Sequence, residues 1–330
     1  MMATYNGEKY IQDQIESLQN QTFTNWELYI SDDDSTDGTL SLLKKLKAKE
    51  PRIKTIIKNK SRYHGSYANY FNIMNYVKKN SACFDYYFYC DQDDIWKENK
   101  LEREIIALAN IENTFSVNMP AFCYCDLLIC DKNCKSTGDK MSNHIRTQFI
   151  DNPYNTFFKE QYVWGTTMAH NKAMWDLIYI GDLDQTKNLL THDGYISRYA
   201  ATYGKTVYIS EPLVMYRRTG NNVSGTPGNY NSLSAVVKRI LFKMPVLIDN
   251  AANVYWDSLY FAYHAPKNVP LINEVKQCFH KNISAYYFMK EYNILTNEKF
   301  WGRCSTKTIL YLKLYKKSKI FLNNFYGVKK

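Results

Sequence analysis

Segments with the pattern of short strands alternate with segments of helical pattern along the first 115 residues of this 330-residue chain. Strands are predicted at 26–30, 53–57 and 86–90, and helices at 10–18, 39–46, 67–77 and 97–111. This alternation is typical of an α/β fold with a parallel sheet and helices on both faces. Because ligands bind beyond the carboxyl ends of the strands in such sheets, we expect a functional site at that edge.

An acidic cluster directly follows the third predicted strand. It contains Asp91, Asp93 and Asp94 and continues into Ile95 and Trp96. Crowded carboxylates repel each other, and their hard oxygen atoms suit Mg²⁺ or Mn²⁺, which keep open positions for phosphate oxygens. Such a cation could neutralise the charge that grows on a diphosphate leaving group. The alternative is a solvated turn that caps the helix after it.

A second acidic cluster, Asp32, Asp33 and Asp34, follows the first predicted strand. Carboxylates at this position can accept hydrogen bonds from a base N–H or from ribose hydroxyls. Asp33 is the preferred candidate, with Asp32 or Asp34 as alternates. A turn and helix cap formed with Ser35 and Thr36 would explain one or two of the three by itself.

Asp193 is the candidate general base, because an acceptor hydroxyl must lose a proton as it attacks. His192 beside it could orient Asp193 or contact phosphate. The alternative is that Asp193 caps a helix that begins there. Arg217 and Arg218 follow an apolar segment and could bind a diphosphate, although exposed arginines are usually solvated.

The net charge of +10 favours anionic partners such as nucleotide phosphates or an acidic membrane face. Nucleic acid is not expected, because no recognition motif accompanies the charge. We find no signal peptide and no run of about 20 apolar residues, so a cytoplasmic setting without disulfides is expected. Cys123 and Cys125 lie in an apolar run and are interpreted as small strand residues, because the cysteine spacing lacks C-x2-C pairs.

Several motifs occur together in a fixed order. They are Ala3-Thr4-Tyr5-Asn6-Gly7, Ser31 to Thr39, Asp91-Gln92-Asp93-Asp94-Ile95-Trp96 with Lys100-Leu101, Gly165-Thr166-Thr167-Met168, His192-Asp193, and Tyr216-Arg217 through Asn222-Val223-Ser224-Gly225. With them the chain resembles the inverting glycosyltransferases of family 2, which have a GT-A fold. The resemblance is greatest to the bacterial polysaccharide branch that includes rhamnosyltransferases, and it spans roughly residues 2–225.

The resemblance implies roles on the donor side of the site. Thr4 and Asn6 would line the nucleotide pocket, and Asp33 would contact the base. Asp91 and Asp93 would serve the Mn²⁺ or Mg²⁺ ion and the diphosphate of a nucleotide sugar. The fold implied is GT-A, a Rossmann-like and mostly parallel sheet.

The resemblance also implies the reaction. Asp193 would be the catalytic base of a single displacement with inversion, and Asp94 a near neighbour of the metal. The donor would be a nucleotide-diphosphate sugar such as dTDP-rhamnose or a UDP-hexose, and the acceptor a glycan or lipid-linked molecule in cell-surface polysaccharide synthesis. A nucleotidyltransferase would need a Gly-rich basic loop near the N-terminus, and a non-catalytic binder would lack Asp91 or Asp193.

Two positions depart from the family pattern. Family members have a full apolar strand before the Ala3 motif, whereas only Met1 and Met2 stand there in this sequence. We therefore expect the native protein to carry a few more apolar residues, because that strand is normally central in the sheet. The second departure is Thr219, where the branch usually has a His after the Tyr-Arg pair.

The expected organisation is a GT-A domain over 1–228, with a donor half over about 1–115 and an acceptor half over about 116–228. A helical, basic and aromatic region follows over 229–330. From Gly302 onward, lysines and Arg303 are interleaved with apolar residues, and no Asp or Glu occurs. Such a tail could lie on the anionic inner face of the cell membrane, or it could be an ordinary terminal helix packed on the body.

Overall fold

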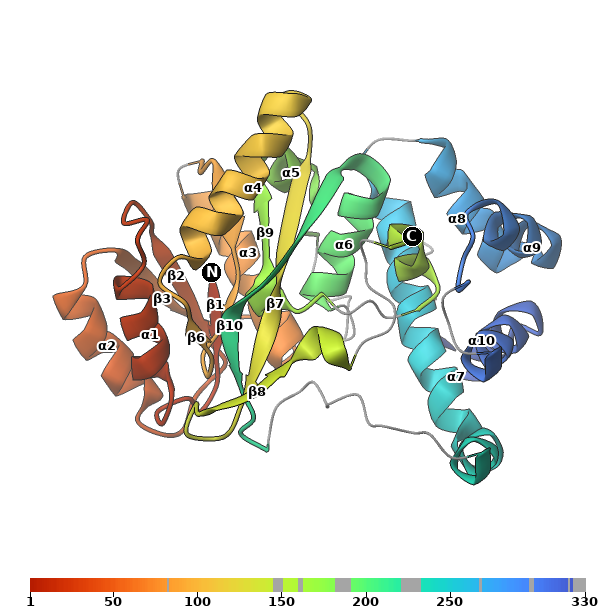
Figure 1. Ribbon diagram of the computed structural model, residues 1–330, viewed down its shortest axis with the longest axis horizontal. Coiled ribbons are helices and arrows are strands. Elements are labelled where there is room, and N and C mark those ends of the chain that lie inside the picture. Colours follow the sequence, from red (N-terminus) through yellow and green to blue (C-terminus); the bar gives the residue numbers. More distant parts are fainter. Residues whose placement is uncertain are drawn as a thin grey trace.

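A computed structural model describes residues 1–81, 83–144, 151–159, 163–181, 191–220, 233–266, 269–296, 300–319 and 321–322, with backbone alone for 233–243 and 301. The chain forms two adjoining sheets flanked by helices, and its C-terminal helices gather at one end (Figure 1). The first sheet has the strand order β3-β2-β1-β5. Its strands are β1 (Met2–Thr4), β2 (Leu28–Asp32), β3 (Ile53–Lys58) and β5 (Cys90–Asp91).

All strand pairs of the first sheet are parallel, which confirms the predicted α/β pattern. The helices between the strands of this sheet are α1 (Ile11–Gln19), α2 (Thr39–Lys49) and α3 (Ser66–Asn80), and α4 (Lys100–Thr114) follows the last strand. Each begins within three residues of its predicted start. Buried apolar residues such as Ile15, Ile30 and Leu43 form the core between these helices and the sheet.

The first strand is short but central. Met2 pairs with Ile30 of β2 on one side and with Cys90 of β5 on the other. The amine of Met1 is buried and donates to the carbonyl of Phe88 at 2.8 Å. Burial lowers the pKa of this amine, because the charged form loses its hydration.

The aromatic segment at 86–90, predicted as one strand, is divided between the two sheets. β4 (Tyr86–Phe88) pairs with β9 (Met168–Asn171) in the second sheet, whereas β5 pairs with β1 in the first. The prediction of a single strand was therefore wrong. Tyr89 is the fully buried residue at the crossing.

The second sheet has the order β4-β9-β7-β10-β6, with β8 (Ser136–Lys140) paired to β7 (Ala121–Cys130). β7 runs parallel to β10 (Lys205–Arg217), whereas β9 and β6 (Ile95–Trp96) are antiparallel to their partners. Register shifts around Pro212 bend β10, as expected for a proline in a strand. Cys123 and Cys125 are buried in β7, which confirms their interpretation as strand residues.

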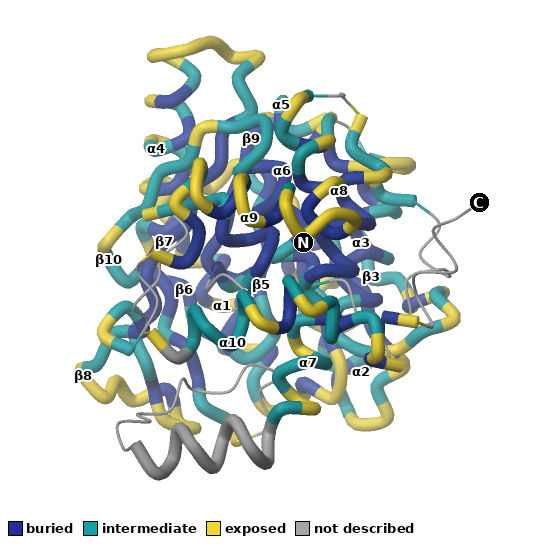
Figure 2. The backbone as a smooth tube through the Cα atoms, turned by 90° about the vertical axis from the view of Figure 1, so that its right-hand side faces the viewer, coloured by how far each residue is buried: buried dark blue, intermediate teal, exposed yellow. Residues whose placement is uncertain are grey.

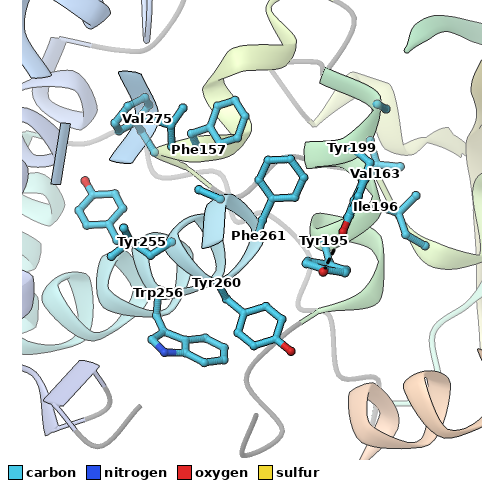
Figure 3. Packing of buried hydrophobic residues seen from close by; sticks show 14 of the residues in the cluster. Phe157, Val163, Tyr195, Ile196, Tyr199, Tyr255, Trp256, Tyr260, Phe261 and Val275 are labelled. Carbon is cyan, nitrogen blue, oxygen red and sulfur yellow. Dashed lines mark hydrogen bonds between the residues drawn. The ribbon is translucent and has the colours of Figure 1, made fainter. Parts of the chain in front are cut away.

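Over its described residues, the C-terminal region contains four α-helices, which pack against the α/β part through a continuous core. They are α7 (Leu233–His264), α8 (Pro270–His280), α9 (Asn282–Glu291) and α10 (Phe300–Tyr311). Aromatic side chains of α7 meet those of α6 (His192–Tyr203), as in the contact of Tyr199 with Phe261 at 4.8 Å between ring centroids (Figure 3). The boundary expected at 228/229 falls outside the described residues.

The basic tail packs on the body over its described part. Ile309, Leu310, Tyr315 and Phe321 are all buried in the same core as α7. This packing supports the terminal-helix alternative for these side chains. Within the described ranges, no helix combines the length and the apolar character needed to cross a bilayer.

Candidate active site

Loop 5–7, which follows β1, joins the two acidic clusters. Tyr5 N donates to Gln92 Oε1 at 2.9 Å, and Gln92 Nε2 donates to Tyr5 O at 2.8 Å. On the other side, Asn6 N donates to Ser35 Oγ at 2.9 Å and Thr36 N donates to Asn6 Oδ1 at 2.8 Å. The two clusters therefore meet at the carboxyl edge of the first sheet, as the sequence predicted.

The close fit of Gln92 explains the glycine in this loop. A Cβ atom at Gly7 would lie 2.2 Å from Gln92 Oε1, which is far inside contact distance. Asn6 has a left-handed backbone with φ of 47°, a conformation that asparagine tolerates better than most residues. Asn6 is exposed, so its side chain can reach a ligand at this edge.

Asp91 ends β5 and lies among groups from three elements. Its Oδ1 accepts from the hydroxyl of Tyr70 at 2.7 Å, and the Tyr70 ring stacks on His192 with 3.8 Å between ring centroids. Burial raises the pKa of Asp91, the Tyr70 hydrogen bond and His192 lower it, and the Asp193 carboxylate raises it further. The structure thus brings Asp91, His192 and Asp193 together.

Asp93 and Asp94 add two more carboxylates to the acidic loop (residues 91–94). Burial and then the charge of Asp91 raise the pKa of Asp93 to about 7. Burial, Asp93 and Asp91 raise the pKa of Asp94 well above its usual range, although its Oδ1 accepts from the backbone N–H of Arg217 at 3.2 Å. The carboxylates of the loop therefore disfavour one another's ionised forms.

This excess of negative charge fits a divalent cation. Asp91 and Asp93 could each offer a hard oxygen ligand. Within the described ranges, no three His, Cys, Asp or Glu side chains are grouped so that they could hold a metal ion together. A cation bound by Asp91 and Asp93 would therefore take its other ligands from diphosphate oxygens and water.

Arg217 is buried and contacts protein groups on several sides. Its Nη2 donates to Asp13 Oδ2 at 2.7 Å, its Nε to Asp93 O at 2.9 Å and its Nη1 to Lys132 O at 3.3 Å. The guanidinium also lies 4.9 Å from the ring centroid of Tyr10. These contacts make Arg217 a support for the acidic loop, in addition to its candidate role toward a diphosphate.

Trp96 belongs to the core below the acidic loop. Its Nε1 donates to Thr166 Oγ1 at 3.2 Å, and the side chain is almost fully buried. Lys100 Nζ lies 3.9 Å from the Trp96 ring centroid and pairs with Glu104 Oε2 at 2.6 Å. Both members of this ion pair are fully buried. Trp96 thus stabilises the loop from beneath.

Asp193 lies in the first turn of α6. Thr191 is the N-cap, because its Oγ1 accepts from Gly194 N at 3.2 Å. The alternative that Asp193 itself caps the helix is therefore wrong. Asp193 Oδ1 accepts from the same Gly194 N at 2.7 Å, and burial raises the pKa of the carboxylate.

His192 is a buried imidazole whose polar atoms are not used by the fold. Neither ring nitrogen has a hydrogen-bond partner within the described part of the chain. Burial lowers the pKa of His192 to about 4, so the ring is neutral at physiological pH. A Cβ at Gly165 would lie 2.2 Å from His192 Nε2, so only glycine fits over this ring.

Asp33 fixes the loop at 59–65. Its Oδ1 accepts from Asn59 Nδ2 at 2.7 Å and lies 2.9 Å from His64 Nδ1, and its Oδ2 accepts from Gly65 N at 2.5 Å. The side chain is 4% exposed. Because a carboxylate offers about four acceptor positions, three contacts leave one for a ligand.

The neighbours of Asp33 differ in their surroundings. Thr4 is buried and donates to Asp32 Oδ2 at 2.9 Å, so both side chains lie beneath the surface of the site. Asp34 is exposed and pairs with Lys58 at 3.0 Å. Among Asp32, Asp33 and Asp34, Asp34 alone is exposed, and its carboxylate lies in this surface ion pair.

Sequence reasoning missed three residues of the site. Tyr70 looks like an ordinary apolar position of a helix, and nothing in its neighbourhood predicts contacts with Asp91 and His192. Gln92 stands inside the strongest motif, and its position as a polar residue between Asp91 and Asp93 was the available signal. Gly165 was quoted as part of a motif, but its role depends on His192. The motif at 222–225 lies outside the described residues.

Comparisons with known proteins agree with this geometry. Residues 1–129 match the family described as Glycosyl transferase family 2. The dTDP-rhamnosyl transferase RfbG of Shigella flexneri is 29% identical, with 68% of this chain and 73% of that protein covered. The UDP-Glc:alpha-D-GlcNAc-diphosphoundecaprenol beta-1,3-glucosyltransferase WfgD of Escherichia coli is 35% identical over 32% of this chain and 38% of that protein.

A solved structure supports the fold. The crystal structure of S. aureus TarS 1-349 in complex with UDP-GlcNAc has a TM-score of 0.51 and 13% identity, and the match covers 99% of this chain and 89% of that one. At this identity the likeness shows the fold alone, which is GT-A. The predicted fold is confirmed, and the predicted family is confirmed for residues 1–129. Residues 1–129 form a glycosyl transferase family 2 domain, and the chain is a glycosyltransferase.

Proposed function

We propose that this glycosyltransferase moves a sugar from a nucleotide-diphosphate donor to a glycan or lipid-linked acceptor, with inversion and with Mn²⁺ or Mg²⁺. The observation that carries the proposal is the gathering of Asp91, Asp93 and Asp193 at the carboxyl edge of the sheet, where the charge of Asp193 raises the pKa of Asp91 and the charge of Asp91 raises the pKa of Asp93. The names of the relatives favour dTDP-rhamnose or a UDP-hexose as donor, in cell-surface polysaccharide synthesis.

Asp91 and Asp93 would hold the cation and the donor's diphosphate. A divalent ion at this position supplies Lewis-acid stabilisation of the nucleoside diphosphate as it leaves. The chain's own contribution is the placement of the loop. Gln92 fixes it to loop 5–7, and Arg217 fixes the backbone of Asp93.

Asp193 would act as the general base. Burial raises its pKa, which makes it a better proton acceptor than an ordinary carboxylate. The Gly194 N–H and the Thr191 hydroxyl both donate to this carboxylate and would orient it toward an acceptor hydroxyl. His192, neutral and buried beside it, would help to fix the geometry between Asp91 and Asp193.

Asn6 and Asp33 would recognise the nucleotide. Asn6 is exposed at the edge of the site, and Asp33 has an acceptor position left for a base N–H. Thr4 would act indirectly, since its hydroxyl is directed at Asp32. Asp34 is the alternate for a ribose contact because its carboxylate is exposed.

We also propose the organisation that frames this site. A GT-A domain over 1–228 would comprise a donor half and an acceptor half that meet at about residue 115, followed by the helical region over 229–330. The position of Asp193 supports this division, because it comes from the second half and faces Asp91 of the first. A cytoplasmic enzyme at the inner face of the membrane would suit a lipid-linked acceptor.

A donor screen tests the proposal. The full chain is incubated with a panel of nucleotide sugars in Mn²⁺, in Mg²⁺ and in EDTA, and nucleoside diphosphate release is measured. We expect release with dTDP-rhamnose or a UDP-hexose only when a metal is present. If EDTA does not affect the release of nucleoside diphosphate, the reaction does not require a metal. If the chain instead releases pyrophosphate from a nucleoside triphosphate and a sugar phosphate, it is a nucleotidyltransferase. Donor binding without release or transfer would identify a non-catalytic homologue.

A further inference from the structure

Helix α9 has one face in the core and one face in solvent. Ile283, Tyr286 and Tyr287 are 57%, 50% and 60% exposed, and Lys290 is exposed beside them. Their spacing places all four on one side of the helix. The opposite side is buried and consists of Ala285, Phe288 and Met289. Figure 2 looks onto the side of the molecule that carries this helix.

The segment after α10 adds another exposed apolar side chain near α9. Tyr311 of α10 donates to Met289 Sδ at 3.6 Å, and the nearby Tyr286 contributes to raising its pKa after burial. Leu312, which follows, is 66% exposed. We call Ile283, Tyr286, Tyr287, Lys290, Leu312 and Lys313 the α9–α10 surface.

The same region concentrates the positive charge of the chain. Residues 270–322 contain ten Lys or Arg and three Glu, so +7 of the net +10 lies there. Lys313 and Lys316 are close enough that Lys313 adds to the effect of burial in lowering the pKa of Lys316. A cation already crowded by other cations gains most from an anionic partner.

The residue types of the α9–α10 surface indicate which kind of partner it binds. Tyrosine combines an apolar ring with a polar hydroxyl, which suits the boundary between lipid headgroups and acyl chains. Lysines add about 1 kcal/mol each near an anionic lipid surface, which is roughly a fivefold gain in affinity. A second copy of this chain would bring two regions of charge +7 together, and a nucleic acid would leave Ile283 and Leu312 without a partner.

We propose that the α9–α10 surface binds an anionic lipid bilayer, with Ile283, Tyr286 and Tyr287 entering the headgroup region. Lys290 and Lys313 then lie at the level of the lipid phosphates. Ile309 and Leu310 of the tail are buried in the core and are not free to enter a bilayer, so the α9–α10 surface makes the membrane contact instead. It goes beyond the glycosyl transfer proposed above and does not depend on it.

Vesicle co-sedimentation tests this proposal with the full chain. Phosphatidylcholine vesicles with and without phosphatidylglycerol are compared at low and high salt. We expect binding to the anionic vesicles alone, weakened by salt. The Tyr286→Ser/Tyr287→Ser variant and the Lys290→Glu variant should each bind at least about tenfold more weakly, since each removes apolar area or charge from the interface.

A matched control carries the same kind of change elsewhere. Ile106→Ser/Val117→Ser removes two exposed apolar side chains near α4, and it should bind vesicles like the wild type. Circular dichroism and nucleoside diphosphate release with a water-soluble acceptor confirm that each variant is folded. Equal loss in the control, no binding by the wild type, or equal binding by all variants overturns the proposal. A dimer in sedimentation velocity that Tyr286→Ser/Tyr287→Ser dissociates, without vesicle binding, assigns the surface to a second copy.

Discussion

Replacing Asp93 by Asn should stabilise the metal-free protein and abolish its response to metal. The pKa of Asp93 is raised to about 7 by burial and by Asp91, whereas an unfolded aspartate has a pKa near its ordinary value of 3.8. Between these two pH values the folded state binds more protons, so stability falls as pH rises from about 4 to about 7. Asp93→Asn keeps the shape of the side chain and removes this loss.

The difference between the folded and unfolded pKa of Asp93 sets the size of the stability gain in Asp93→Asn. About three pKa units correspond to roughly 4 kcal/mol at pH 8, and this is a ceiling because water reaches the partly exposed carboxylate. A gain of about half that value would raise the melting temperature by roughly 4 °C in a chain of this size. Saturating Mn²⁺ at about 100 times its dissociation constant would add about 2.7 kcal/mol to the wild type and little to the variant.

Thermal unfolding of both proteins at pH 5 and pH 8, with EDTA and with Mn²⁺, measures these effects. We expect the variant to melt higher than the wild type at pH 8 in EDTA, and the wild type alone to gain from Mn²⁺. At pH 5 the variant's advantage should fall to less than half of its value at pH 8, because pH 5 lies only about one unit above the unfolded pKa of 3.8. A variant that melts lower at pH 8, or equal stabilisation of both proteins by Mn²⁺, would refute the assignment of Asp93.

Three further substitutions test other parts of the site. Asp193→Asn should lower the transfer rate about 10²–10⁴-fold, because it removes the general base. Donor binding in calorimetry should stay nearly unchanged, and a normal transfer rate would exclude Asp193 as the base. Gln92→Ala removes two hydrogen bonds to Tyr5 and should lower the free energy of unfolding in urea by about 1–3 kcal/mol. It should also weaken donor binding, and an unchanged donor affinity would show that loop 5–7 does not belong to the donor site. Lys100→Met leaves Glu104 buried without its ion-pair partner and should lower the free energy of unfolding by about 3–5 kcal/mol in the same assay. Lys100→Met/Glu104→Leu should recover most of this stability, and an equal loss in both variants would contradict the argument that the two charges stabilise each other.

The elements of the first sheet could be predicted because each carries its own periodic pattern. The 3.6-residue period of α1 and the apolar run of β2 depend only on neighbouring residues. The meeting of the two acidic clusters also followed, since parallel strands present their carboxyl ends at one edge. Local pattern and simple topology were therefore enough for the α/β fold and for the place of the site.

Features that depend on distant partners could not be predicted. The division of 86–90 between two sheets is decided by pairing with β9 and β1, which local sequence does not reveal. The support role of Arg217 depends on Asp13, which lies 204 positions away. At the start of α6, Thr191 and Asp193 are both good N-caps, and only the backbone geometry selects Thr191.

The crossing at Tyr89 has a consequence for the order in which the chain can assemble. β4 has its partner in β9, and β6 has its partner in β10, so one strand on each side of the acidic loop waits for a segment synthesised about 80 to 120 residues later. The first 115 residues look like a self-contained half, yet their acidic loop runs from β5, which pairs with β1 of the same half, into β6, which pairs with β10 of the other half. During synthesis on the ribosome, the acidic loop therefore cannot gain its full support before β10 has emerged.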